Sequence, residues 1–101
     1  MKIINVTNNH RGLVREQLRN TDAELVEVYS AGNTDVIYTK APSHHEIVVS
    51  NKHRAIRPDE RKQIKSFFVD KRIDQKTIDR DNINLIETPN LIEISIPIPG
   101  E

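Results

Sequence analysis

Residues 25–40 read LVEVYSAGNTDVIYTK, and this stretch decides the fold. Gly32-Asn33 lies at its centre, and glycine at the first of two turn residues suits a type II′ turn, whose twist matches that of paired strands. The apolar and β-branched residues on both sides are typical of strands. The sequence therefore predicts an antiparallel hairpin with strands at 25–31 and 34–40.

The register of this hairpin places apolar side chains on both of its faces. A two-residue turn pairs Ala31 with Thr34, and side chains that lie opposite each other share a face. Since both faces carry apolar groups, we expect each of them to be covered. One face has Val26, Val28 and Ile37, and the other has Leu25, Tyr29, Val36 and Tyr38.

Towards the N-terminus, residues 2–6 predict a short strand and residues 10–20 predict a helix. Leu13, Val14 and Leu18 fall on one face of that helix, as the helical period requires of a packed face. A neighbouring face carries arginines at four-residue intervals, Arg11, Arg15 and Arg19.

Towards the C-terminus, residues 45–50 are rich in β-branched side chains and predict a further strand. Pro58 suits the first position of a helix, because the amide hydrogen that proline lacks would be unpaired there. The apolar spacing behind Pro58 extends this helix to about residue 70.

The remaining C-terminal residues predict a linker and a second hairpin. The stretch 70–82 is highly charged and is typical of a solvated linker. Strands are predicted at 84–88 and 91–96, and antiparallel pairing would place Leu85 opposite Ile94.

The whole chain, residues 1–101, is predicted to form a single α+β domain. The order βαβββαββ favours a two-layer arrangement, with a mainly antiparallel sheet and two helices on one of its faces. A chain of 101 residues, 36% of them hydrophobic, is long enough for one core. No apolar run approaches the roughly 18 to 20 residues that cross a bilayer, and no signal peptide is recognisable, so we expect a cytoplasmic protein.

Composition and motifs argue against several kinds of chemistry. The chain has no cysteine, which excludes a disulfide framework, a thiolate zinc site, an iron–sulfur cluster and a thiol nucleophile. No Gly-x-Ser-x-Gly motif frames a serine. His44 and His45 are adjacent on a predicted strand edge and would point to opposite faces, which disfavours a metal site. We therefore expect no catalytic residue, no bound metal, no cofactor and no enzymatic activity.

Three stretches of the chain resemble a known family. They are VTNNHRGLV at 6–14, YSAGNTDVIYTKAPSHHEIVVSNK at 29–52 and ETPNLIEIS at 87–95. Together they are similar to a family of short, functionally uncharacterised proteins from the lactic-acid group of Gram-positive bacteria. The resemblance spans nearly the whole chain and implies a stand-alone bacterial protein, but it implies no activity, cofactor or site residue.

The favoured functional hypothesis is a binding or assembly module. If both helices cover one face of the sheet, something else should cover the second face, and a homodimer partner or another protein would do so. Tyrosine suits such an interface because it buries a large ring and keeps a polar tip. The predicted interface consists of Leu25, Tyr29, Val36 and Tyr38.

The alternative hypothesis is binding of RNA, a nucleotide or another anion. The first helix start could attract anions, although helix capping alone explains Thr7, Asn8 and Asn9 and is the favoured interpretation of those residues. Basic residues of the second helix region would extend this surface if both helices shared a face, although Asp59 and Glu60 make a solvated charged helix the simpler interpretation. The candidate contacts are Asn8, Asn9, His10, Arg11, Arg15, Arg19, Arg54, Arg57, Arg61 and Lys65.

Overall fold

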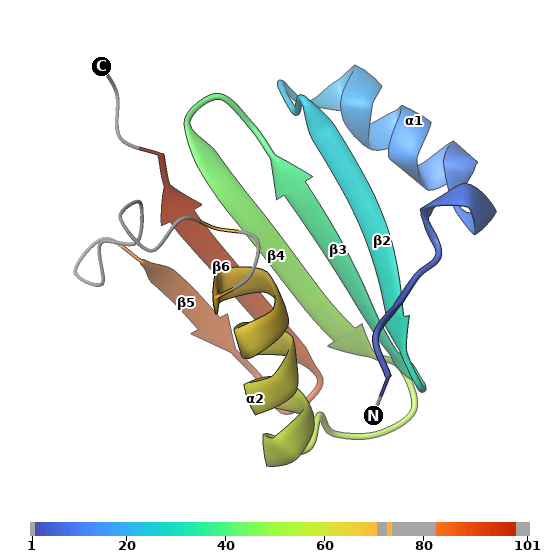
Figure 1. Ribbon diagram of the computed structural model, residues 1–101, viewed down its shortest axis with the longest axis vertical. Helices are drawn as coiled ribbons and strands as arrows, with labels where there is room; N and C mark the ends of the chain where they lie inside the picture. Colours follow the sequence, from blue (N-terminus) through green and yellow to red (C-terminus); the bar gives the residue numbers. More distant parts are fainter. Residues whose placement is uncertain (1, 71–72, 74–82, 99–101) are drawn as a thin grey trace.

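The computed structural model describes residues 2–70, 73 and 83–98, which form a six-stranded antiparallel sheet with two α-helices (Figure 1). The strand order across the sheet is β1-β2-β3-β4-β6-β5. The predicted α+β class and the order βαβββαββ are confirmed. The strands are β1 (Ile4–Asn5), β2 (Leu25–Ala31), β3 (Thr34–Lys40), β4 (His44–Asn51), β5 (Asn84–Glu87) and β6 (Leu91–Pro97). The helical elements are a 3₁₀ turn η1 (Thr7–Asn9), α1 (Arg11–Asn20), α2 (Pro58–Lys65) and a π-helical turn η2 (Ser66–Asp70) that continues α2.

The central hairpin forms in the predicted register. Ala31 pairs with Thr34. Gly32 has a backbone φ of +63°, a value that residues other than glycine rarely adopt. In the second hairpin, Leu85 pairs with Ile94, also as predicted. Both turns therefore connect neighbouring antiparallel strands, as the sequence predicts.

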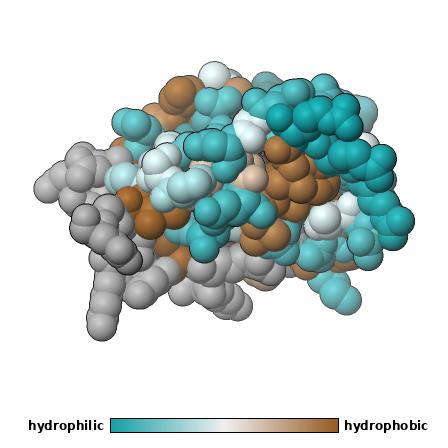
Figure 2. Space-filling view, turned by 90° about the horizontal axis from the view of Figure 1, so that it is seen from above, coloured by the Kyte–Doolittle hydropathy of each residue, from teal (hydrophilic) through white to brown (hydrophobic). Residues whose placement is uncertain are grey.

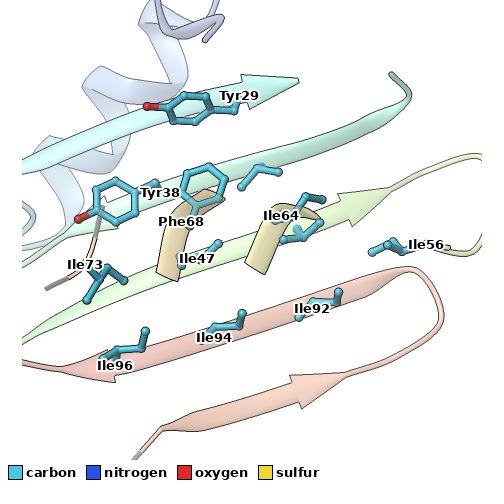
Figure 3. Packing of buried hydrophobic residues seen from close by; sticks show 12 residues of the cluster. Tyr29, Tyr38, Ile47, Ile56, Ile64, Phe68, Ile73, Ile92, Ile94 and Ile96 are labelled. Atoms are coloured by element: carbon cyan, nitrogen blue, oxygen red, sulfur yellow. The ribbon is translucent and has the colours of Figure 1, made fainter. Parts of the chain in front are cut away.

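One face of the sheet is covered by α2 and η2, and we call it the closed face (Figure 1). The rings of Phe67 and Phe68 pack against Tyr29, with centroid distances of 5.6 and 5.0 Å. Figure 3 shows the rings of Tyr29 and Tyr38 beside Phe68 and above the isoleucines of β4 and β6. The buried cluster consists of Tyr29, Val36, Tyr38, Ile47, Val49, Ile56, Ile64, Phe68, Ile73, Ile92, Ile94 and Ile96.

Helix α1 lies on the other face of the sheet, along β2. Val26 and Val28 point to that face and are each only 3% exposed. Gln17 of α1 lines a groove together with Ile37 of β3, which shares this face with Val28. The prediction that both helices cover one face is therefore corrected. Because β2 carries apolar groups on both sides, its sequence is compatible with a helix on either side.

No described element covers the rest of that second face, which spans β3, β4, β6 and β5, and we call it the open face. Alternation along the strands and the pairing register place these side chains on it: Asp35, Ile37, Thr39, His44, Glu46, Val48, Ser50, Asn84, Ile86, Leu91, Glu93, Ser95 and Pro97.

The sequence also predicts a solvated linker at 70–82 and no membrane-spanning segment. Of the predicted linker at 70–82, only residue 70 and Ile73 are described, and Ile73 is buried. No helix in the described part of the chain is both long and apolar enough to cross a membrane.

Candidate binding surfaces

Three of the four predicted interface residues lie in the core of the chain. Tyr29, Val36 and Tyr38 are 1%, 0% and 4% exposed, because α2 and η2 cover the closed face on which they lie. Leu25, the first residue of β2, is 44% exposed. These tyrosines are therefore unavailable to a partner of the folded chain, and the predicted site is corrected. The error follows from the expectation that both helices share one face, which left the face of the tyrosines to a partner.

The open face presents a mainly apolar row to solvent. Ile37, Val48, Glu93 and Ile86 are successive cross-strand partners on β3, β4, β6 and β5. Ile86 is 57% exposed, and Ile37 and Val48 are half-buried. Helix α1 borders this row at β2 and extends no further across the sheet (Figure 1).

A groove of about 320 Å³ lies where α1 meets the open face. Ile37 and Val48 form an apolar floor, and His44 and Glu46 contribute polar groups. His44 Nε2 and Glu46 Oε2 are 3.7 Å apart. Figure 2 shows one end of the molecule, where brown apolar side chains lie among hydrophilic ones.

The open face is also acidic. It carries the carboxylates of Asp35, Glu46 and Glu93, and none of the described residues on it is a lysine or an arginine. Glu46 and Glu93 lie on the neighbouring strands β4 and β6, offset by two residues along the strands. With ordinary β-sheet spacings, this places them about 8 Å apart. A partner for this surface should therefore combine apolar groups with positive charge.

Helix α1 presents the opposite charge on its outer side. Arg11, Arg15 and Arg19, which we call the arginine stripe, are exposed and span an arc of about 80° around the helix. Leu13 and Gln17 are less exposed and lie on the inner side. No ion pair within the described part of the chain engages these arginines. The stripe is about 12 Å long, because an α-helix rises about 1.5 Å per residue.

The residues before α1 do not cap it. Thr7, Asn8 and Asn9 form η1, and His10 occupies the N-cap position without a side-chain hydrogen bond to the helix. The Thr7 hydroxyl oxygen instead accepts a hydrogen bond of 3.0 Å from the amide of Val28. Thr7 thus tethers the start of the chain to β2, while Asn8, Asn9 and His10 stay exposed beside the stripe.

The basic residues near α2 form a separate group. Arg54 is paired with the buried Glu60, and Arg61 Nη1 donates to Glu87 Oε1 at 3.2 Å. Arg57 and Lys65 are exposed. Because α1 and α2 lie on opposite faces of the sheet, the structure does not join this group to the arginine stripe.

Glu60 is the centre of a buried polar network. Its carboxylate is 4% exposed and accepts hydrogen bonds from Arg54 Nη2 at 3.0 Å, the Arg57 amide at 3.1 Å and the Thr34 hydroxyl at 3.1 Å. These donors, led by Arg54, outweigh burial and lower the pKa of Glu60 from 4.5 to about 2. The interpretation of Glu60 as a solvated charge is therefore corrected.

The amide side chains of Asn51 and Asn90 hold the adjoining loops. Asn51 Oδ1 accepts from the amides of His53 and Arg54, and its Nδ2 donates to the Thr34 hydroxyl at 3.1 Å. Asn90 Nδ2 donates to the carbonyls of Asn51 and Arg54. The network thus fixes α2 against the sheet and has a structural role.

His44 and His45 point to opposite faces of the sheet, as expected for neighbours on a strand. His45 is buried on the closed face, where its Nδ1 lies 2.8 Å from the Tyr38 hydroxyl oxygen. Burial, followed by the positive charges of Lys40 and His44, lowers its pKa below 6.5. No group of three His, Asp or Glu side chains among the described residues is arranged to hold a metal ion.

These features define a small antiparallel α+β domain with one closed and one open sheet face. The chain belongs to the family described as a domain of unknown function (DUF1827), whose model matches residues 1–97. This confirms the family resemblance predicted from the sequence.

A solved structure supports the same fold. The chain is similar to a crystal structure described as a conserved protein of unknown function from Streptococcus thermophilus LMG 18311. The two share 50% sequence identity over 99% of each chain, with a TM-score of 0.92. No curated protein matches the chain.

Proposed function

We propose that this protein is a non-enzymatic assembly module that self-associates through the open face of its sheet. The observation that carries the proposal is the cross-strand row on the open face, in which Ile37, Val48 and Ile86 are apolar and Glu93 lies between Val48 and Ile86. No helix of the described chain covers this row. Apolar side chains that solvent reaches on one face of a sheet, with a charged group among them, are typical of interaction surfaces. The closed face, in contrast, is filled by the side chains of the chain itself.

A second candidate function is the binding of nucleic acid or another polyanion by the arginine stripe. Its support is the exposure of three arginines without an ion pair in the described chain. Two features weigh against it. The second basic group lies on the other side of the sheet, and the acidic open face next to α1 would repel phosphate.

Sedimentation velocity over a wide range of protein concentrations tests self-association. We expect the wild-type chain to dimerise, and Val48→Lys to raise the dimer dissociation constant at least tenfold by placing a charge in the apolar row. Ile86→Lys, at a more exposed position on the same face, should act in the same direction. Gln63→Lys adds the same charge on the exposed side of α2 and should leave dimerisation unchanged.

Three results would speak against the proposal. A wild-type chain that stays monomeric at every concentration would contradict self-association. Dimerisation that resists both Val48→Lys and Ile86→Lys would place the interface elsewhere. A particle with excess absorbance at 260 nm, dispersed as salt rises, would support the polyanion alternative, since the chain has two tyrosines and no tryptophan.

A further inference from the structure

We propose that the occupant of the open face is α1 of a second copy, whose arginine stripe lies over Glu46 and Glu93. This inference rests on the proposed self-association and names the partner's contact surface. It predicts a two-fold dimer in which each copy covers the open face of the other.

The position of α1 limits how two open faces can meet. Helix α1 lies above β2 on the same side of the sheet as the open face, and a helix with its side chains is about 10–12 Å thick. Two open faces therefore cannot meet flat, because α1 of each copy stands between them. The α1 helix of a second copy, placed beside the first, would fill the space above β4 and β6.

A two-fold axis produces this arrangement with only two surfaces of each copy, α1 and the open face. A rotation about an axis parallel to the strands moves α1 from above β2 of one copy to above the β6 side of the other. The contact then occurs twice, since each copy provides both a helix and an open face. The two sheets would enclose a layer of two helices.

The charges of α1 and of the open face are complementary. The side of α1 that points away from its own sheet carries Arg11, Arg15 and Arg19 beside one carboxylate, that of Glu16. The open face carries carboxylates and no lysine or arginine among its described residues. Arginines four residues apart are separated by about 6 Å along the helix. Their long side chains can therefore reach two carboxylates about 8 Å apart on neighbouring strands.

Apolar contacts complete the match. Leu18 lies at the margin of the stripe and is 41% exposed, which is high for a leucine on a packed helix. The half-buried Ile37 and Val48 on the open face offer it an apolar surface. A chain with no net charge, yet with a basic helix side and an acidic sheet face, is suited to bind itself.

Two charge-reversed variants test the arrangement. The first, Arg15→Glu with Arg19→Glu, has an acidic stripe and an acidic open face. The second, Glu46→Lys with Glu93→Lys, has a basic stripe and a basic open face. In sedimentation velocity at low salt, each variant alone should dimerise at least tenfold more weakly than the wild type, because like charges meet at both contacts.

Mixing the two variants provides the decisive measurement. In a mixed dimer, opposite charges meet at both contacts, so an equimolar mixture should form a heterodimer close to wild-type strength. Lys62→Glu with Lys65→Glu makes the same number of reversals on exposed positions of α2 and should dimerise like the wild type. Circular dichroism of every variant checks that the fold is kept.

The outcomes separate this inference from the proposed function. If either variant still dimerises as the wild type does, or if the mixture stays monomeric, the α1 contact is wrong. Sensitivity to Val48→Lys would then still support self-association through the open face. A monomeric wild type overturns both proposals. Loss of polynucleotide binding in the Arg15→Glu, Arg19→Glu variant of a monomeric chain would assign the stripe to nucleic acid instead.

Discussion

Val48 and Val49 are neighbours on β4, yet they belong to surfaces with different roles. Val49 points to the closed face and is 1% exposed, whereas Val48 points to the open face and is half-buried. Both faces of the strand carry β-branched residues, so the strand sequence does not distinguish them. What distinguishes them is the covering element, since α2 and η2 bring two phenylalanines to one face only.

The largest predicted effect is on the closed face. Phe68 is fully buried and packs on Tyr29 and Tyr38, so Phe68→Ala should lower the free energy of unfolding by about 3–5 kcal/mol. Urea unfolding would measure the loss. A change below about 1 kcal/mol would contradict a core centred on this ring.

The paired substitutions Val49→Ala and Val48→Ala sharpen the same comparison. Each removes the same two methyl groups from adjacent positions on one strand. We expect the larger loss of unfolding free energy for Val49→Ala, because it leaves a cavity, whereas solvent reaches the site of Val48→Ala. Measured at concentrations where the chain is monomeric, equal losses would contradict the difference between the faces.

Glu60 should make the closed face sensitive to acid. Because its folded pKa of about 2 lies below the ordinary 4.5, its contribution is fully present above pH 4.5 and is lost as pH falls towards 2. Glu60→Gln should cost about 1.5–3 kcal/mol at pH 7. Urea unfolding of this variant should also depend less on pH between 4.5 and 2 than that of the wild type. An identical acid profile would show that Glu60 is not the group responsible.

The Tyr38–His45 contact should have a smaller effect at milder pH. His45 has a lowered pKa in the fold, so its contribution is present above pH 6.5 and is lost as pH falls below that value. Tyr38→Phe keeps the ring and removes the hydroxyl beside His45 Nδ1, which should cost about 0.5–1.5 kcal/mol. Thermal unfolding at pH 7.5 and 5.5 would measure both effects. Stability that rises on acidification through this range would contradict a neutral, buried His45.

The smallest effect on stability is expected at the arginine stripe. Arg15 is exposed and has no ion pair in the described chain, so Arg15→Gln should change the unfolding free energy of the monomer by about 0.5 kcal/mol or less. Chemical unfolding at low protein concentration checks this. A larger loss would mean that Arg15 supports the fold and is not reserved for a partner.

Local sequence signals predicted most of the fold. Gly32 identified the central hairpin and its register, Pro58 identified the start of α2, and the alternation around Leu85 and Ile94 identified the last hairpin. In each case the signal comes from residues close together in the sequence, where turn geometry and side-chain period decide the structure.

The side of the sheet on which each helix packs could not be predicted in this way. One side of β2 carries Val26 and Val28, and the other carries Tyr29, so both sides are apolar. The side on which a helix packs therefore depends on contacts between elements that are distant in the sequence. The same limit hid the role of Glu60, whose partners include Thr34 on a strand 26 residues earlier. One local signal was present, because Glu60 occupies the position of the carboxylate in a capping box that begins at Arg57.

The most direct test of the two-face account uses the absence of cysteine from the chain. Val48→Cys and Val49→Cys each introduce a unique thiol on adjacent residues that point to opposite faces. We predict that a thiol reagent modifies the Val48→Cys variant rapidly at low protein concentration and more slowly as dimers form. The Val49→Cys variant should react slowly at every concentration. Equal reaction rates for the two variants, with no effect of concentration, would contradict the account.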